Sequence, residues 1–117
     1  MARTQGHGNP RWNREETILA LELYHEMGGE IPSEMDERVR ALSALLQRLT
    51  YHPASSRKGS FRNPAGVVFK LQNLHQVATG NGLEHVSAMD QRVWTELGED
   101  LARTKELATN IKEVVKE

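Results

Sequence analysis

Cations and small hydrogen-bonding side chains gather between residues 50 and 63 of this 117-residue chain, in a stretch with no apolar period. Arginine and lysine neutralise phosphates and release counterions, while serine and asparagine bond phosphate oxygens and base edges. A structureless stretch of this length in a small domain is more often functional or disordered than a simple connector. We therefore predict a long exposed loop that contacts DNA through His52, Ser55, Ser56, Arg57, Lys58, Ser60, Arg62 and Asn63.

The helix that follows this loop extends the predicted surface. Asn63 and Pro64 are typical of a helix start, where free N–H groups and the helix dipole attract anions. Lys70 and Asn73 are three residues apart, and we predict them on the exposed side of this helix, within reach of an adenine edge or a phosphate. Two alternatives remain, because Asn63 can serve only as a cap and Asn73 can bind a neighbouring backbone carbonyl.

Two aromatic residues border these basic groups. Trp12 and Phe61 either pack against the domain or stack on a base. Aromatic side chains are buried more often than not, which favours packing for Trp12. For Phe61 both interpretations stay open.

The residues that catalysis or metal binding would need are missing or scattered. The chain has no cysteine, and its five histidines include no pair with H-x-x-x-H spacing. Glu15 and Glu16 begin a helix, where carboxylates favour the dipole, so they do not require a catalytic role. We predict no catalytic residue, no metal and no cofactor, and hence a chain that is not itself an enzyme.

Acidic and basic residues occupy separate stretches of the chain, although its formal net charge is only -1. Eight acids and no lysine or arginine occur from Glu15 to Glu37, whereas seven bases and no acid occur from Arg38 to Leu83. We interpret the basic stretch as the DNA-facing surface and the acidic stretch as a face turned away from DNA or toward a protein partner. The alternative is that the acidic first helix pairs with the basic second helix across a solvated surface.

These side chains must be positioned by helices, because no stretch alternates with the period of a strand. Apolar periods and stop signals predict five helices, at about residues 13 to 27, 36 to 49, 64 to 79, 87 to 97 and 101 to 115. Capping boxes at Asn13 with Glu16 and at Ser87 with Asp90 mark two of the starts. The predicted fold class is all-α, with a long basic loop between the second and third helices.

The length allows one domain, which we place at residues 11 to 117, after a Gly-rich, polar tail at residues 1 to 10 that we expect to be disordered. No apolar run approaches the ~18 residues of a membrane span. Together with the absence of cysteine, this favours a cytoplasmic location without a membrane partner.

Several segments carry a resemblance to a known family. They are W-N-R-E-E at residues 12–16, F-R-N-P-A-G-V at 61–67 with K-L-Q-N-L at 70–74, G-N-G-L at 80–83 and D-Q-R-V-W at 90–94. Over about residues 11 to 115 the chain resembles the N-terminal head domain of McrA-like HNH endonucleases, which are bacterial modification-dependent restriction enzymes. The matching residues Phe61, Arg62, Asn63, Lys70 and Asn73 are implied to contact DNA or to fix the loop.

The resemblance implies a helical module that accompanies readers of 5-methylcytosine or phosphorothioate DNA and a C-terminal HNH nuclease. The chain has no HNH constellation, so cleavage and metal binding do not carry over. Our leading hypothesis is an accessory domain for bacterial defence that binds double-stranded DNA, with a modified base as one candidate target. The alternative is a protein-interaction or dimerisation module that holds the nuclease and reader domains together.

Overall fold

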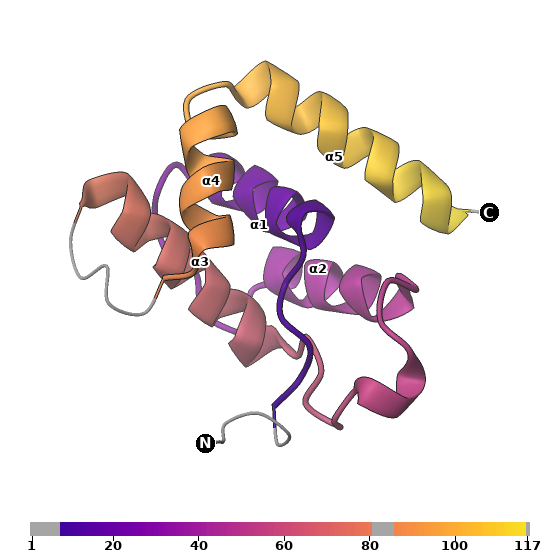
Figure 1. Cartoon of the computed structure of the whole chain (residues 1–117). Helices are drawn as coiled ribbons and strands as arrows, with labels where there is room; N and C mark the ends of the chain where they lie inside the picture. The colour runs from indigo at the N-terminus through magenta and orange to yellow at the C-terminus, as the bar shows by residue number, and fades with distance from the viewer. Residues whose placement is uncertain (1–7, 81–85, 117) are drawn as a thin grey trace.

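The computed structural model describes residues 8–80 and 86–116, and within these ranges its regular structure is entirely helical. The α-helices of the described chain are α1 (Arg14–Glu26), α2 (Glu37–Arg48), α3 (Pro64–Thr79), α4 (Ala88–Leu97) and α5 (Leu101–Lys116). They form one globule, as Figure 1 shows. The predicted all-α class is confirmed, whereas the tail expected to be disordered falls mostly on residues 1–7, outside the described residues.

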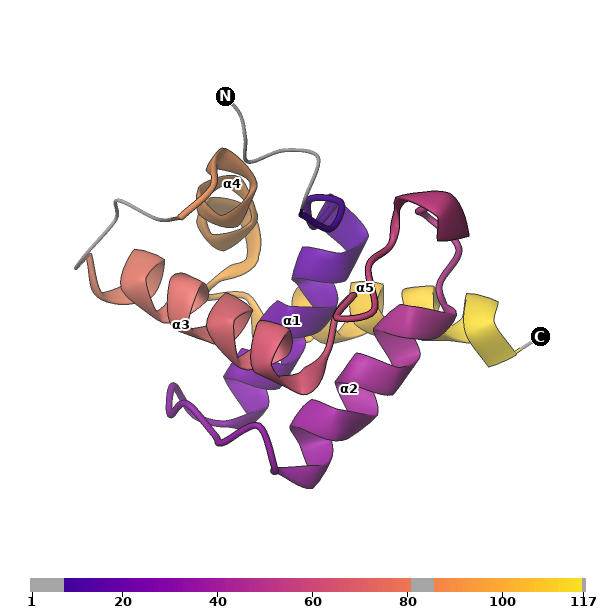
Figure 2. The ribbon, with the colours of Figure 1, turned by 90° about the horizontal axis from the view of Figure 1, so that it is seen from below.

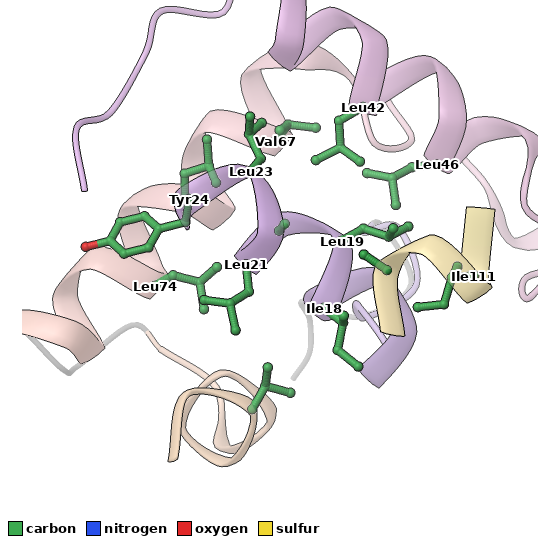
Figure 3. Close-up of a cluster of buried hydrophobic side chains, with 14 of the residues drawn as sticks. Ile18, Leu19, Leu21, Leu23, Tyr24, Leu42, Leu46, Val67, Leu74 and Ile111 are labelled. Carbon is green, nitrogen blue, oxygen red and sulfur yellow. The ribbon is translucent and has the colours of Figure 1, made fainter. Parts of the chain in front are cut away.

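Helix α1 is the central element of the fold, because it contacts each of the four other α-helices. Its run from Glu16 to Leu21 is buried without interruption, and a helix that is buried around its whole circumference must be covered on every side. Figure 2 shows α1 in the middle of the bundle. Figure 3 shows its side chains meeting residues of three other helices, namely Leu42, Leu46, Val67, Leu74 and Ile111.

The helix starts are fixed by the caps that the sequence indicates. Asn13 and Glu16 form a capping box at α1, and Ser87 with Asp90 forms one at α4. The side chain of Asn63 caps α3. Each cap satisfies backbone N–H groups that have no partner inside the helix, so the first residues of these helices are well defined.

Helix α5 occupies the predicted segment, but its buried stripe begins later than the apolar pattern suggests. Leu101 is 58% exposed, whereas Thr104 is fully buried. The Thr104 hydroxyl donates to the carbonyl of Leu97 at 3.1 Å and ties the start of α5 to the end of α4. Ala108 and Ile111 continue the stripe into the core.

The segment between α2 and α3 is not the freely exposed loop that its composition predicts. It contains a turn of 3₁₀-helix, η1 (Ala54–Ser56), and then folds inward so that Phe61 and Arg62 are buried. Arg62 has a φ of 47°, a left-handed conformation that non-glycine residues rarely adopt. Its carbonyl accepts the Ser43 hydroxyl of α2 at 2.7 Å, so the end of this segment belongs to the core.

Among the described residues, no helix is both long enough and apolar enough to cross a membrane.

Candidate nucleic-acid interface

Arg62 is the centre of a buried ionic network. Its Nη2 and Nε atoms donate to the two carboxylate oxygens of Glu16 at 2.9 and 3.1 Å. The guanidinium carbon lies 4.4 Å from the ring centroid of Phe61 and 4.8 Å from that of Trp12. His52 Nε2 lies 3.0 Å from the same carboxylate. The prediction that Arg62 is an exposed cation is therefore wrong, and its charge is compensated inside the domain.

Glu16 is expected to make the stability of the domain depend on pH. Burial raises the pKa of its carboxyl, but hydrogen bonds from Arg62, His52 and the Asn13 backbone outweigh burial and hold this pKa below its ordinary value. Such a group contributes stability above its unfolded pKa of about 4.3, and this contribution is lost as the pH falls through the folded pKa.

Urea titrations at a series of pH values, on the natural chain and on Glu16→Gln, measure this contribution. We expect the variant to be less stable at about pH 7 and to approach the natural chain at about pH 3, because glutamine cannot titrate. A difference in unfolding free energy that stays constant over this range would contradict the assignment.

Arg57 is used to close the end of helix α2. Its guanidinium donates to the carbonyls of Gln47 at 2.9 Å and of His52 at 3.1 Å, and also to the carbonyl of Leu49. The carbonyls at a helix end have no partner within the helix, and a cation there also complements the helix dipole. The same guanidinium lies 4.4 Å from the Phe61 ring centroid. Arg57 is thus half-buried and held by the backbone rather than presented on a loop.

The remaining predicted loop residues divide into bonded and open ones. Ser56 donates to the Pro53 carbonyl at 2.8 Å, which closes a local turn. Ser60 accepts from the side chain of Asn9 at 3.2 Å. Ser55 and Lys58 are exposed. Contact with DNA stays a prediction for the open residues.

Lys70 and Asn73 lie on a buried side of α3, so the prediction of their exposure is wrong. Lys70 is 7% exposed and Asn73 is 6% exposed. The ammonium of Lys70 donates to the fully buried carboxylate of Asp90 at 2.8 Å and lies 5.2 Å from the ring centroid of Trp12. Residues three positions apart lie on the same face of a helix, so Lys70 and Asn73 both face inward.

The acidic first helix does not pair with the basic second helix, because no ion pair joins α1 to α2 within the described residues. Arg38 of α2 instead binds Asp36, at the start of its own helix. Glu16, the buried acid of α1, pairs with Arg62 of the segment between α2 and α3 instead. Phe61 packs inside the domain, and Trp12 packs against the core while keeping part of its surface open.

That open part of Trp12 borders two adjoining hollows, where the segment before α1 meets α3 and the start of α4. Both are lined by the same four residues, Arg11, Trp12, Lys70 and Asn73. We call this surface the Trp12 groove. One hollow, of about 540 Å³, extends over Ser60 and Phe69, and the other, of about 570 Å³, extends over Ser87 and Arg92. Both volumes fall within the ~300–1,000 Å³ of ligand-binding clefts.

The rim of the Trp12 groove is cationic. Arg11 and Arg92 are exposed, and neither forms an ion pair with a described residue. Lys58 lies beside the groove, because its backbone N–H donates to Asn9, a lining residue, at 2.6 Å. Phe69, which is 57% exposed, adds an aromatic face to the rim. Such a rim can contact phosphates and stack on a base.

The floor of the groove is different in character. There the charge of Lys70 is compensated by Asp90, so the floor is close to neutral. The side-chain amide of Asn73 forms no hydrogen bond with any described residue, although Asn73 lines both hollows. The floor therefore offers hydrogen bonding without net charge.

The sequence did not reveal the cations of the rim as one group, because charge was compared only between stretches of the chain. Arg11 and Arg92 lie on either side of the basic stretch, and only the fold brings them to one groove. Phe69 did give a signal, since it is a large aromatic residue outside the apolar stripe of its helix, formed by Val67, Leu71 and Leu74.

No group of three or more histidine, cysteine or acidic side chains within residues 8–80 and 86–116 is arranged to hold a metal ion. Comparison of the chain with family models, with curated proteins and with solved structures gave no match.

Proposed function

We propose that this chain is a DNA-binding accessory module of a bacterial modification-dependent HNH restriction endonuclease, and that it contacts duplex DNA through the Trp12 groove. The observation that carries the proposal is that two exposed cations, Arg11 and Arg92, line the Trp12 groove, with the exposed Lys58 beside it and the exposed ring of Phe69 on one of its two hollows. The restriction-enzyme context rests on the resemblance of the sequence segments.

In this proposal the rim cations neutralise phosphates and the groove supplies the rest of the surface. Arg57, Arg62 and Lys70 are excluded from the contact because their charged groups are bonded inside the domain. Three phosphate contacts give a logarithmic salt slope of about -2.7, which corresponds to a loss of about 40-fold in affinity between 50 and 200 mM salt.

The test is fluorescence anisotropy with a labelled duplex, comparing two triple variants of equal charge. Alanine at Arg11, Lys58 and Arg92 should abolish most of the salt-dependent affinity. Alanine at Arg40, Arg48 and Lys105 removes three exposed cations from α2 and α5, and it should leave most of the affinity in place.

Equal losses in the two triple variants would mean that affinity follows net charge and not the groove. An absence of binding by the natural chain at low salt would overturn the proposal itself.

Sensing of a modified base is tested with duplexes of one sequence that are unmodified, cytosine-methylated, adenine-methylated or phosphorothioate. A preference of about tenfold or more, equal to 1.4 kcal/mol, would assign recognition to this domain. Equal affinity for all four would restrict its role to non-specific affinity, with recognition left to the companion domains.

One observation favours the second candidate function, a protein-interaction module that associates with a second copy. A hollow of about 180 Å³ between α1, α2 and α5 is lined by apolar side chains that include Leu23, Leu42 and Leu45. Glu26 and Arg38 border the same hollow, and both charge signs on one patch suit a self-complementary interface.

Sedimentation equilibrium of the natural chain and of Ala41→Glu, a change at an exposed residue of this hollow, tests the second candidate. A dimer in the natural chain that is lost in the variant would support it. A monomer at every concentration would exclude self-association.

A further inference from the structure

Beyond phosphate contact at the rim, we infer that the floor of the Trp12 groove binds a nucleobase that stands outside a base pair. This inference rests on the proposed DNA contact and adds the class of group that the floor receives. Three features of the floor carry it: an unpaired buried amide, a compensated charge and an aromatic wall.

The unpaired amide belongs to Asn73. The residue is only 6% exposed, yet its side chain has no hydrogen-bond partner among the described residues. Among the described residues, Oε1 of Gln76 is the side-chain polar atom that lacks a partner and is also fully enclosed. The unpaired Asn73 amide is not fully enclosed, so it reaches the open space of the groove. Buried polar groups in folded proteins are almost always paired, and an amide left open to a hollow is suited to pair with a ligand.

The compensated charge decides between a base and a phosphate. A phosphate on the floor would face the carboxylate of Asp90, which is fully buried and matched only by Lys70. A base brings no net charge and avoids this repulsion. The Asn73 amide offers a donor beside an acceptor, the arrangement that pairs with the donor and acceptor on the edge of adenine.

The aromatic wall is Trp12, which lines both hollows. Bases stack readily on aromatic rings, and Phe69 supplies a second ring at the rim of one hollow. A base inside a duplex has its edge paired and its faces stacked, so it cannot enter the floor. A base that has left the stack can enter while its flanking phosphates remain at the rim, beside Arg11 and Arg92.

The experiment measures affinity for three DNAs of one sequence: a fully paired duplex, a duplex with one unpaired adenine, and a duplex with an abasic site at that position. We expect the natural chain to bind the unpaired adenine about tenfold more tightly than the abasic site. The variant Asn73→Leu should lose this preference and bind the adenine and abasic duplexes equally. Its melting temperature should equal or exceed that of the natural chain, because no hydrogen bond is removed.

The variant Asn73→Ser provides a second test if leucine perturbs the fold, since serine is smaller and remains polar. Equal affinity of the natural chain for the adenine and abasic duplexes would overturn the inference. So would a preference that persists in both Asn73 variants. Salt-dependent binding without any base preference would overturn this inference alone, whereas no binding to any of the three DNAs would overturn it together with the proposed function.

Discussion

Replacing Arg62 with alanine is expected to lower the free energy of unfolding by about 3 to 5 kcal/mol. The replacement removes both hydrogen bonds that the guanidinium donates to the carboxylate of Glu16, a residue that is only 1% exposed. It also removes the cation that lies against the rings of Phe61 and Trp12. Urea denaturation followed by circular dichroism measures the loss.

The matched control is Lys58→Ala, which removes an exposed cation four residues away in the same segment and should change stability by less than about 0.5 kcal/mol. The double variant Glu16→Gln, Arg62→Met removes both charges and should recover part of the loss, because no buried charge is left alone. If Arg62→Ala proved as stable as Lys58→Ala, the buried network around Arg62 would be refuted.

The second large effect is expected for Asp90→Ala. The ammonium of Lys70 would lose its partner in a buried site, at a cost of about 3 to 5 kcal/mol. Asp90 also completes the capping box of α4 by accepting from the Ser87 backbone N–H at 3.3 Å, so the start of that helix would be weakened by about 1 kcal/mol more. Thermal unfolding and urea titration of the variant measure the sum.

Glu96→Ala is the control for this prediction, because Glu96 is an exposed carboxylate on the same helix that pairs with Arg14 at the surface. Its effect should be far smaller than that of Asp90→Ala. The double variant Lys70→Met, Asp90→Asn keeps a capping side chain and removes both charges, so it should be more stable than Asp90→Ala alone. Equal losses in the Asp90 and Glu96 variants would contradict a buried Lys70–Asp90 pair.

The helices and their caps could be predicted from the sequence because both are local features. The 3.6-residue period of apolar positions and the spacing of Asn13 with Glu16, or of Ser87 with Asp90, depend only on neighbours along the chain. Leu101 shows where this approach fails. Its spacing fits the stripe of α5, yet the turn after α4 leaves it at the surface.

The partners of the charged residues could not be predicted in this way. Arg62 and Glu16, like Lys70 and Asp90, are distant in the sequence, and an arginine in a polar segment has the same local pattern whether it is exposed or buried. The left-handed turn that directs Arg62 inward is made by Arg62 itself and not by a glycine, so the sequence gives no sign of it.

Residues from four of the five segments that carry the resemblance meet in one network, whereas most of the G-N-G-L segment lies outside the described residues. The ring of Trp12 lies near both Arg62 and Lys70, and these two cations bind Glu16 and Asp90 respectively. Of the two roles that the resemblance implies for the matching residues, fixing the loop agrees with these contacts.

The most direct test of the account is a titration of the isotope-labelled chain with duplex DNA at low salt, followed by two-dimensional NMR of backbone and side-chain N–H groups. We expect the largest shifts at the Trp12 indole and at the backbone of Arg11 and of Ser87 to Arg92. Shifts confined to α2 and α5, or an unchanged spectrum, would contradict the assignment of the Trp12 groove as the DNA interface.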